Sequence, residues 1–232
     1  MKLDILAELN AERAARRAVI LITDTATGDQ KLIREEDIEG SDRPDLYDAL
    51  VRAGRSRPLK EEEGGGFANV LVPPAKLVLV GAVHISQELA PIARRLGYDV
   101  TVVDPRTAFA TEDRFPDVRL IAEWPDEVLP EIGVDRWTAF CALTHDPKVD
   151  DPGLIHAIRK ECFYIGALGS RKTHARRVER LTAEGITEAQ LARIHAPIGL
   201  AIGSQSPAEI AVAIMAQITG TLRLGSDSAK AA

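Results

Sequence analysis

The stretch Lys76-Leu-Val-Leu-Val-Gly-Ala-Val-His-Ile-Ser86 decides the fold. Its first five residues form an apolar run of strand length, and Gly81 follows at the point where a turn is needed. Residues 84–96 then have a helical pattern, and a second apolar run over residues 98–103 ends at Asp104. Strand, helix and strand in this order predict a βαβ unit, the building block of a parallel sheet.

The same alternation continues further along the chain. Strand-like runs are predicted at residues 118–122, 138–143 and 162–165, and the segments between them are long enough for crossover helices. N-capping patterns mark three helix starts, at Asp151-Pro152, Thr187 and Ser206-Pro207. We therefore expect residues 75–224 to form an α/β domain with a Rossmann-like, doubly wound parallel sheet.

The first 74 residues have a different pattern, which is typical of a small α+β domain. It predicts helices at residues 2–16 and 45–53 and strands at 18–23, 31–34 and 67–72, with the first two strands paired as a hairpin. Because two consecutive prolines cannot continue a strand ladder, we place the domain boundary at Pro73-Pro74. Residues 225–232 are small and polar, and we expect a flexible tail there.

The composition excludes several classes of protein. Of the 232 residues, 45% are hydrophobic and 28% are charged, which is typical of soluble globular chains and excludes global disorder. The 29 basic and 35 acidic residues give a net charge of -6, which argues against nucleic acid as a partner. No apolar run reaches the roughly 18 residues of a membrane span, and the acidic N-terminal residues do not fit a signal peptide. The sequence therefore predicts a cytoplasmic protein without a membrane span.

The two cysteines, Cys141 and Cys162, are predicted to be buried thiols. They lie 21 positions apart (162 minus 141) in candidate strands, a spacing that builds neither a disulfide framework nor a Cys-x-x-Cys metal site. This usage of cysteine fits a reducing compartment, and we expect no metal centre from these thiols.

In open α/β sheets, ligands bind beyond the carboxyl ends of the strands, and the first such place is Gly81 to Ser86. Together with Asp104 it is similar to a dinucleotide-binding fingerprint, in which the acid binds a ribose. Val83 and Ser86 stand where that fingerprint requires glycine, which argues against tight NAD(P) binding. The alternative is a helix packed closely on its strand without a ligand, with His84 as a cap of the turn.

The second place is Thr144-His145-Asp146, which follows the predicted strand that contains Cys141. A neighbouring His and Asp suggest ligand binding or general acid–base chemistry, yet no third group completes a triad. Asp-Pro pairs are also common in turns, so a purely structural role stays open. A metal site that uses Asp146, Asp150 and Asp151 is the minor alternative, because their spacing does not match a calcium loop.

The third place, Gly166 to Lys172, is the most informative. A predicted strand leads through Gly166 and Gly169 into a helix that opens at Ser170, so backbone N–H groups and the positive end of a helix dipole face any anion. Residues 165–180 hold five cations, Arg171, Lys172, Arg176, Arg177 and Arg180, against one acid, Glu179, a net +4 in a chain of net -6. This contrast predicts a phosphate-type site. The alternative is a solvated basic face.

The fourth place, Arg193 to Gly203, is ambiguous by itself. Gly199 and Gly203 mark bends at which the backbone comes close to another group. His195 is predicted either to contact a ligand or to be a core histidine.

Several ordered motifs give the chain a resemblance to a known family. They are Gly81-Ala-Val-His84, Val102-Val-Asp-Pro-Arg106, Leu143-Thr-His-Asp-Pro-Lys148, Asp150-Asp-Pro152, Tyr164-Ile-Gly-Ala-Leu-Gly-Ser-Arg171 and Ile194-His-Ala-Pro-Ile-Gly-Leu200. Over residues 75–221 the chain thus resembles the XdhC/CoxI family, the accessory factors of xanthine dehydrogenase and related molybdenum hydroxylases. Several motifs in a fixed order are far more specific than a lone glycine pattern.

The resemblance implies a maturation factor rather than an enzyme that turns over xanthine. Members of the family are implied to hold the molybdenum cofactor (molybdopterin), to support its sulfuration and to deliver it to the apo-hydroxylase. This cofactor is a pterin that carries a phosphate, which the third place would suit. The expected cofactor-binding residues are Gly81, His84, Asp104, Arg106, Thr144, His145, Asp146, Gly166, Gly169, Ser170, Arg171, Lys172 and His195.

The resemblance also implies partners: a molybdenum hydroxylase apoenzyme, a cysteine desulfurase and a second copy of the chain in a homo-oligomer, a dimer. Longer family members carry a glycine- and serine-rich stretch that leads to a cysteine in their N-terminal half, whereas here no cysteine precedes Cys141. A short companion XdhC-type polypeptide would supply what is absent. Two other classes stay open: an NAD(P)-dependent oxidoreductase, and a docking scaffold whose basic helix contacts protein only.

Overall fold

The computed structural model describes residues 3–225, and the chain divides into two compact units. The first unit ends at Pro73 and the second begins at Pro74. The first residue of the helix expected at 2–16 and nearly all of the tail expected at 225–232 lie outside the described residues.

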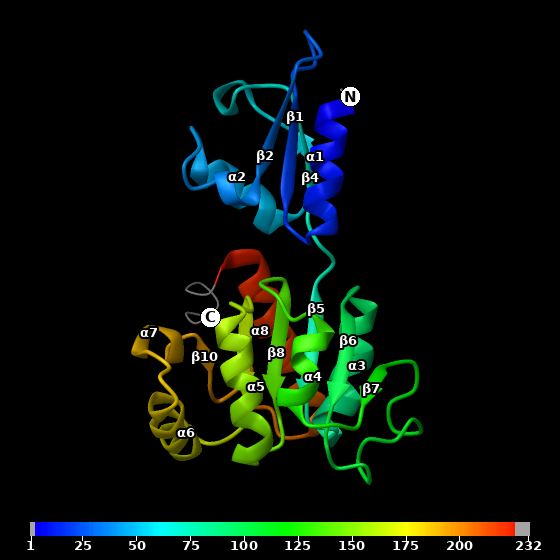
Figure 1. Ribbon diagram of the computed structural model, residues 1–232, viewed down its shortest axis with the longest axis vertical. Coiled ribbons are helices and arrows are strands. Elements are labelled where there is room, and N and C mark those ends of the chain that lie inside the picture. The colour runs from blue at the N-terminus through cyan, green and yellow to red at the C-terminus, as the bar shows by residue number, and fades with distance from the viewer. Residues whose placement is uncertain (1–2, 226–232) are drawn as a thin grey trace. The chain divides into compact units, whose positions relative to one another are not determined.

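The N-terminal unit is a small α+β fold (Figure 1). Its elements are α1 (Leu3–Ala14), β1 (Val19–Thr23), β2 (Gln30–Arg34), η1 (Glu35–Asp37), α2 (Pro44–Ala53), β3 (Arg57–Pro58), η2 (Glu61–Glu63) and β4 (Phe67–Leu71). The strands form an antiparallel sheet in the order β2-β1-β4-β3, and both helices pack against the buried central strand β1. Gly54, at a φ of 61°, ends α2 in the left-handed conformation that glycine adopts without strain.

The C-terminal unit is a parallel α/β fold, as the sequence predicts, and its sheet has six strands, of which β10 was not predicted. Its elements are β5 (Lys76–Val80), α3 (His84–Arg95), β6 (Asp99–Val103), β7 (Arg119–Ile121), α4 (Pro125–Ile132), β8 (Thr138–Ala142), α5 (Pro147–Arg159), β9 (Tyr164–Ala167), α6 (Arg171–Ala183), α7 (Glu188–Leu191), β10 (Ile194–His195) and α8 (Pro207–Leu224). The strand order is β10-β9-β8-β5-β6-β7, which is doubly wound because the chain runs outward from β5 and then returns to its other side.

Helices cover both faces of this sheet (Figure 1). Side chains alternate along β5, so that Leu77 and Leu79 face one way and Val78 and Val80 face the other. The leucines pack with α3 and α8, and the valines pack with α4, α5 and α6. Burial on both faces explains why the predicted strands read as continuous apolar runs.

In the C-terminal unit, two elements differ from the prediction by two residues or more at a boundary. Strand β9 runs to Ala167 rather than ending at Ile165. Helix α5 begins at Pro147, with the Asp146 side chain accepting a hydrogen bond from the Lys148 N–H group, and not at the later Asp-Pro pair. This segment contains two such pairs, Asp146-Pro147 and Asp151-Pro152, with equal local preference, and only the tertiary contacts described below select the first. The capping boxes expected at Thr187 and Ser206 are confirmed.

Across residues 3–225 we find no helix with both the length and the hydrophobicity that crossing a membrane requires.

Candidate functional site

The carboxyl ends of β5 and β8 mark the position at which the strand order reverses. These two strands are neighbours in the sheet, and Val80 is in register with both Val103 and Ala142. The loops that follow β5, β6 and β8 therefore begin at the same level of one sheet edge. In doubly wound sheets this switch point is where ligands bind, and four of the predicted places lie along this edge.

Gly81 lets the loops after β5 and β8 come into close contact. Its φ is 120°, and a Cβ atom added there would lie 3.0 Å from Cγ2 of Thr144 and 3.3 Å from the carbonyl carbon of Leu143. The carbonyl of Gly81 also accepts a hydrogen bond from the buried Ser86 hydroxyl on α3. Gly81 and Ser86 thus serve close packing of the strand, the helix and the neighbouring loop.

Asp104, which follows β6, has both carboxylate oxygens occupied by this protein's own groups. Oδ2 accepts hydrogen bonds from the Ala82 N–H at 2.7 Å and from Nη2 of Arg106 at 2.7 Å. Oδ1 accepts from the Arg106 N–H and from its Nε, both at 2.9 Å. Burial alone would raise the pKa of Asp104, but these hydrogen bonds from Arg106 and Ala82 together hold it below its usual value.

This arrangement changes what the β6 edge can recognise. A ribose diol would need a free carboxylate oxygen at Asp104, and the four hydrogen bonds leave little capacity for one. The group offered to a ligand is instead the partly exposed guanidinium of Arg106, which lies 4.8 Å from the centroid of the exposed Phe109 ring. The site therefore presents a cation where a dinucleotide site presents an acid.

The loop after β8 is held by a buried acid that the sequence singled out only for the alternative metal site and within a family motif, not as a cofactor-binding residue. Asp150 is 1% exposed, and its Oδ1 accepts hydrogen bonds from the Thr144 hydroxyl (2.7 Å) and N–H (3.2 Å). Its Oδ2 accepts from the N–H of His145 at 3.0 Å, and His145 has a φ of 65°. Few non-glycine residues adopt that conformation, and at ligand sites it is a known form of stored strain. Burial raises the pKa of Asp150.

The loop after β9 leads into the first turn of α6. The Ser170 hydroxyl accepts a hydrogen bond from the Thr173 N–H at 3.2 Å and caps the helix, as predicted. Arg171 and Lys172 are exposed on this first turn, while Gly169, at a φ of 134°, makes the turn before it. A Cβ at Gly169 would lie 3.7 Å from Nδ1 of His145, so the loops after β8 and β9 meet here.

Gly166 was expected to belong to this loop, and that expectation is wrong. Gly166 is buried inside β9, where an added Cβ would lie 2.5 Å from Cδ1 of Ile198 and 2.8 Å from the Tyr164 hydroxyl oxygen. It is a glycine because a side chain from the loop after β10 occupies the space beside it. Its backbone N–H therefore does not face an anion at the start of α6.

Arg177 is a second buried residue that the sequence did not single out as cofactor-binding. Its side chain is 2% exposed, and Nη2 donates a hydrogen bond to the carbonyl of Leu168 at 3.0 Å. Nη2 also lies 3.9 Å from Oδ2 of Asp150. Arg177 was counted only as one of the five cations that predict an anion site on α6, but it lies four residues before the buried Leu181. The helical period of 3.6 residues was the signal that could have found it.

The two remaining histidines of the predicted set differ from each other. His84 is exposed at the first position of α3, beside the loop after β5. His195 lies in β10, is 6% exposed and stacks on the ring of Tyr164, with the ring centroids 4.8 Å apart. Of the two readings that were open for His195, the structure favours the core histidine.

Both cysteines are buried, and burial disfavours the thiolate form of each. Burial raises the pKa of Cys141 and raises that of Cys162 to about 12. Cys141 lies in β8 as predicted, whereas Cys162 precedes β9. Among the residues that the structure describes, no three His, Cys, Asp or Glu side chains gather into a group that could hold a metal ion.

We expect Cys141→Ser to lower the stability of the protein without changing ligand binding. A hydroxyl placed in the apolar interior without a partner costs about 1–3 kcal/mol. Urea unfolding of this variant and of Cys141→Ala, which removes the thiol without adding a polar group, will measure that cost. Retained stability together with a loss of cofactor binding would show that this thiol acts in the site.

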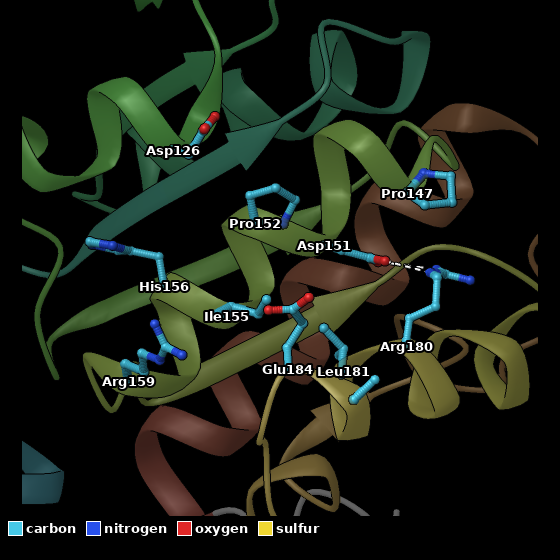
Figure 2. Close-up of a pocket in the computed structure, with 11 residues that line it drawn as sticks. Asp126, Pro147, Asp151, Pro152, Ile155, His156, Arg159, Arg180, Leu181 and Glu184 are labelled. Atoms are coloured by element: carbon cyan, nitrogen blue, oxygen red, sulfur yellow. Dashed lines mark hydrogen bonds and ion pairs between the residues drawn. The ribbon is translucent and has the colours of Figure 1, made fainter.

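A separate groove of about 660 Å³ lies between α5 and α6 (Figure 2). Its floor is apolar, with Pro152, Ile155 and Leu181, and its rim carries the ion pair between Asp151 and Arg180. None of the expected cofactor-binding residues lines it. The sheet edge, and not this groove, is therefore the candidate site.

The doubly wound sheet, with glycine-mediated contacts and charged groups at its switch point, defines the C-terminal unit as a Rossmann-type domain. Residues 77–218 match the family described as the XdhC Rossmann domain, and the chain belongs to that family. The resemblance seen in the ordered motifs is thereby confirmed.

Known proteins similar to this chain have related descriptions. It is 32% identical over 156 residues to a probable xanthine dehydrogenase subunit of Bacillus subtilis (strain 168), covering 67% of this chain and 45% of the relative. It is 27% identical over 175 residues to the molybdenum cofactor insertion chaperone PaoD of Escherichia coli (strain K12), covering 74% of this chain and 49% of the relative. The chain thus spans less than half the length of these two relatives.

A solved structure shows the same fold. A crystal structure described as a xanthine dehydrogenase from Bacillus halodurans matches with a TM-score of 0.69 at 24% identity. The match covers 97% of this chain and 68% of that one. At this identity the likeness concerns the fold alone.

Proposed function

We propose that this protein is an accessory factor that binds the molybdenum cofactor and delivers it, in sulfurated form, to a molybdenum hydroxylase of the xanthine dehydrogenase type. The observation that carries the proposal is the set of groups suited to an anion along the carboxyl edge of the sheet. There the capped N-terminus of α6, with exposed Arg171 and Lys172, shares a sheet edge with the guanidinium of Arg106. Groups of this kind suit the phosphate of a pterin cofactor.

The donors of the site suit the phosphate of the molybdenum cofactor better than its metal centre. Backbone N–H groups, the Ser170 hydroxyl and cations suit a phosphate. A soft metal–dithiolene centre would be matched by thiolate, and the only two cysteines, Cys141 and Cys162, lie in the core. The chain is therefore proposed to hold the cofactor by its phosphate, and a companion XdhC-type polypeptide or the client apoenzyme to cover the metal.

The relatives' descriptions support the same role. One is described as a molybdenum cofactor insertion chaperone and another as a xanthine dehydrogenase subunit. On that basis we propose an apo-hydroxylase as the receiving partner. A cysteine desulfurase as the source of sulfur and a homo-oligomeric state are proposed from the family resemblance alone. Apart from binding and delivery, no turnover of substrate by this chain is proposed.

Co-purification tests the proposal directly. The protein is expressed in cells with an active cofactor pathway, purified, treated with acid and oxidised, and the released pterin is measured by fluorescence. A fluorescent pterin in amounts that approach the protein concentration is expected. Its absence from wild-type protein, with a known cofactor-binding protein positive in parallel, would favour the docking scaffold.

We expect Arg171→Ala to weaken cofactor binding by about 10-fold or more. A hydrogen bond to a charged group contributes roughly 1.5–3 kcal/mol, and Arg171 lies on the first turn of α6. The matched control is Arg176→Ala, an exposed arginine more than one turn along the same helix. Arg180 is a poorer control, because it forms an ion pair with Asp151.

Competition by inorganic phosphate refines this measurement. Phosphate should weaken cofactor binding to the wild type and to Arg176→Ala, and much less to Arg171→Ala, which has already lost the contact. If the Arg171 and Arg176 variants bind the cofactor with equal affinity, and phosphate does not compete, the start of α6 is only a solvated basic face and the anion site is contradicted.

We expect no reduction of NAD or NADP by simple alcohols or hydroxy acids in the presence of this protein. Val83 places a side chain where the fingerprint needs close approach to a pyrophosphate, and the Asp104 carboxylate is occupied by Arg106 and Ala82. Absorbance of the reduced nicotinamide measures the reaction. Turnover above a control without protein would support the hypothesis that the protein is an NAD(P)-dependent oxidoreductase.

A further inference from the structure

Arg177 occupies a position on α6 that would ordinarily be apolar. Leu181, four residues later, is fully buried, whereas the neighbouring Arg176 is exposed. The stripe of α6 that faces the sheet thus contains an arginine whose side chain is 2% exposed. Burial lowers the pKa of Arg177, which means that the interior disfavours its charge. An apolar residue would fill this stripe without that cost.

The buried guanidinium is only partly satisfied. One nitrogen, Nη2, donates to the carbonyl of Leu168, while within residues 3–225 the buried Nε and Nη1 have no hydrogen-bond partner. The nearest acid, Asp150, is 3.9 Å away, too far for a hydrogen bond. Folding stability does not explain a charge held in this way, and a buried unsatisfied group calls for another reason.

The partners of the pair lie on different loops of the site. Asp150 holds the loop after β8, because its carboxylate accepts from Thr144 and from the N–H of His145, the residue at a φ of 65°. Arg177 holds the loop after β9 through the carbonyl of Leu168, which directly precedes Gly169. The two loops touch, since a Cβ on Gly169 would lie 3.7 Å from Nδ1 of His145.

We propose that Arg177 and Asp150 are positioning residues that link these two loops and thereby set the affinity of the first turn of α6 for a phosphate-type anion. Neither residue needs to touch the ligand. Asp150 holds His145 in its left-handed conformation, Arg177 fixes the turn at Gly169, and their ion pair sets the spacing between the two. This inference rests on the proposed function, because the anion site it concerns is the same one.

The decisive variant is the double substitution Arg177→Met with Asp150→Asn, compared with Arg177→Met alone. The single variant leaves a buried carboxylate without its cation, so both its melting temperature and its affinity for inorganic phosphate should fall. The double variant removes both charges with groups of similar size, so its melting temperature should rise above that of the single variant but stay below wild type, because a donor of Thr144 or His145 loses its acceptor. The introduced asparagine keeps one acceptor oxygen, yet it cannot hold both Thr144 and His145, so phosphate affinity should stay about 10-fold below wild type.

Arg176→Met, on the exposed face of the same helix, is the matched control and should bind phosphate as wild type does. Arg177→Lys, which keeps the charge but not the forked geometry, should restore part of the affinity. If the double variant recovers both stability and phosphate affinity, or if Arg177→Met binds as tightly as Arg176→Met, the pair is merely structural and the inference fails.

NMR spectroscopy distinguishes a failure of the inferred link between the two loops from a failure of the proposed function. Without any ligand, the amide signal of His145, which donates to Asp150 and not to Arg177, should shift in Arg177→Met and stay in place in Arg176→Met. If wild type binds no phosphate at all, the anion site fails, while a shifted His145 amide in Arg177→Met would still support the loop link. Phosphate binding by wild type with an unmoved His145 amide in Arg177→Met would overturn the link alone.

Discussion

Asp104→Ala is expected to lower the free energy of unfolding of the C-terminal unit by about 3 kcal/mol. The side chain is fully buried and accepts four hydrogen bonds, one from the Ala82 N–H and three from Arg106. Alanine would leave the Ala82 N–H buried without an acceptor, which by itself costs about 1–3 kcal/mol. Arg106 would lose its bidentate partner and could recover only part of that interaction from water.

Asp99→Ala provides the matched control, since Asp99 is an exposed acid at the other end of the same strand, β6. Its loss should stay within about 0.5 kcal/mol. Denaturant unfolding of both variants, with tryptophan fluorescence as the signal, will measure the difference. Equal losses would mean that the Asp104 carboxylate does not organise the first turn.

The pH dependence gives this prediction a second readout. Because the pKa of Asp104 is lowered in the folded state, its stabilising contribution is present above the ordinary value of about 3.9 and is lost as pH falls through the lowered value. The stability difference between wild type and Asp104→Ala should therefore be constant from about pH 5 to 7 and shrink below about pH 4. A difference that grows in acid would contradict the assigned hydrogen bonds.

Gly81→Ala should have a comparable effect, about 3 kcal/mol, for a different reason. At a φ of 120° any side chain is strained, and the new methyl group would lie 3.0 Å from Cγ2 of Thr144 and 3.3 Å from the backbone of Leu143. Relief would require β5 and the loop after β8 to separate at the switch point. Anion affinity should fall together with stability, because Thr144 belongs to the loop that meets α6.

The chain offers a matched glycine for this test. Gly97 also has a positive φ, 86°, but nothing lies within 4 Å of a Cβ added there. Gly97→Ala should therefore lose only the conformational term, about 1–2 kcal/mol, and leave phosphate binding unchanged. If both substitutions cost the same in thermal unfolding, the close approach at Gly81 carries no energy of its own.

The parallel sheet could be predicted from the sequence because its signals are local. Strands β5 and β8, buried on both faces, appear as apolar runs, and capping patterns at Ser170, Thr187 and Ser206 mark the helices that follow. The order of the motifs also identified the family, which the match over residues 77–218 confirms. None of these signals depends on which residues are in contact in the folded protein.

Local signals failed where two equally good alternatives exist. Asp-Pro occurs twice near the start of α5: Asp146 is the cap, whereas Asp151 lies inside the helix and forms an ion pair with Arg180, 29 positions later (180 minus 151). Gly166 was predicted to lie in a phosphate-binding loop because glycine is common in such loops. In the structure it is a glycine because the side chain of Ile198, a residue 32 positions later (198 minus 166), fills the space beside it. Such contacts are invisible to patterns that span one turn or one strand.

Fold class and family follow from the sequence alone, since each depends on periodicity, capping or motif order along the chain, while the anion site at the start of α6 stays a prediction from the same kind of local signal. Only the tertiary structure decided that Asp104 is committed to Arg106 and that Arg177 is buried beside Asp150. A charged side chain has the same local signature whether water or a neighbouring loop surrounds it. Its burial and its partners depend on residues from distant parts of the chain, which become neighbours only when the sheet has formed.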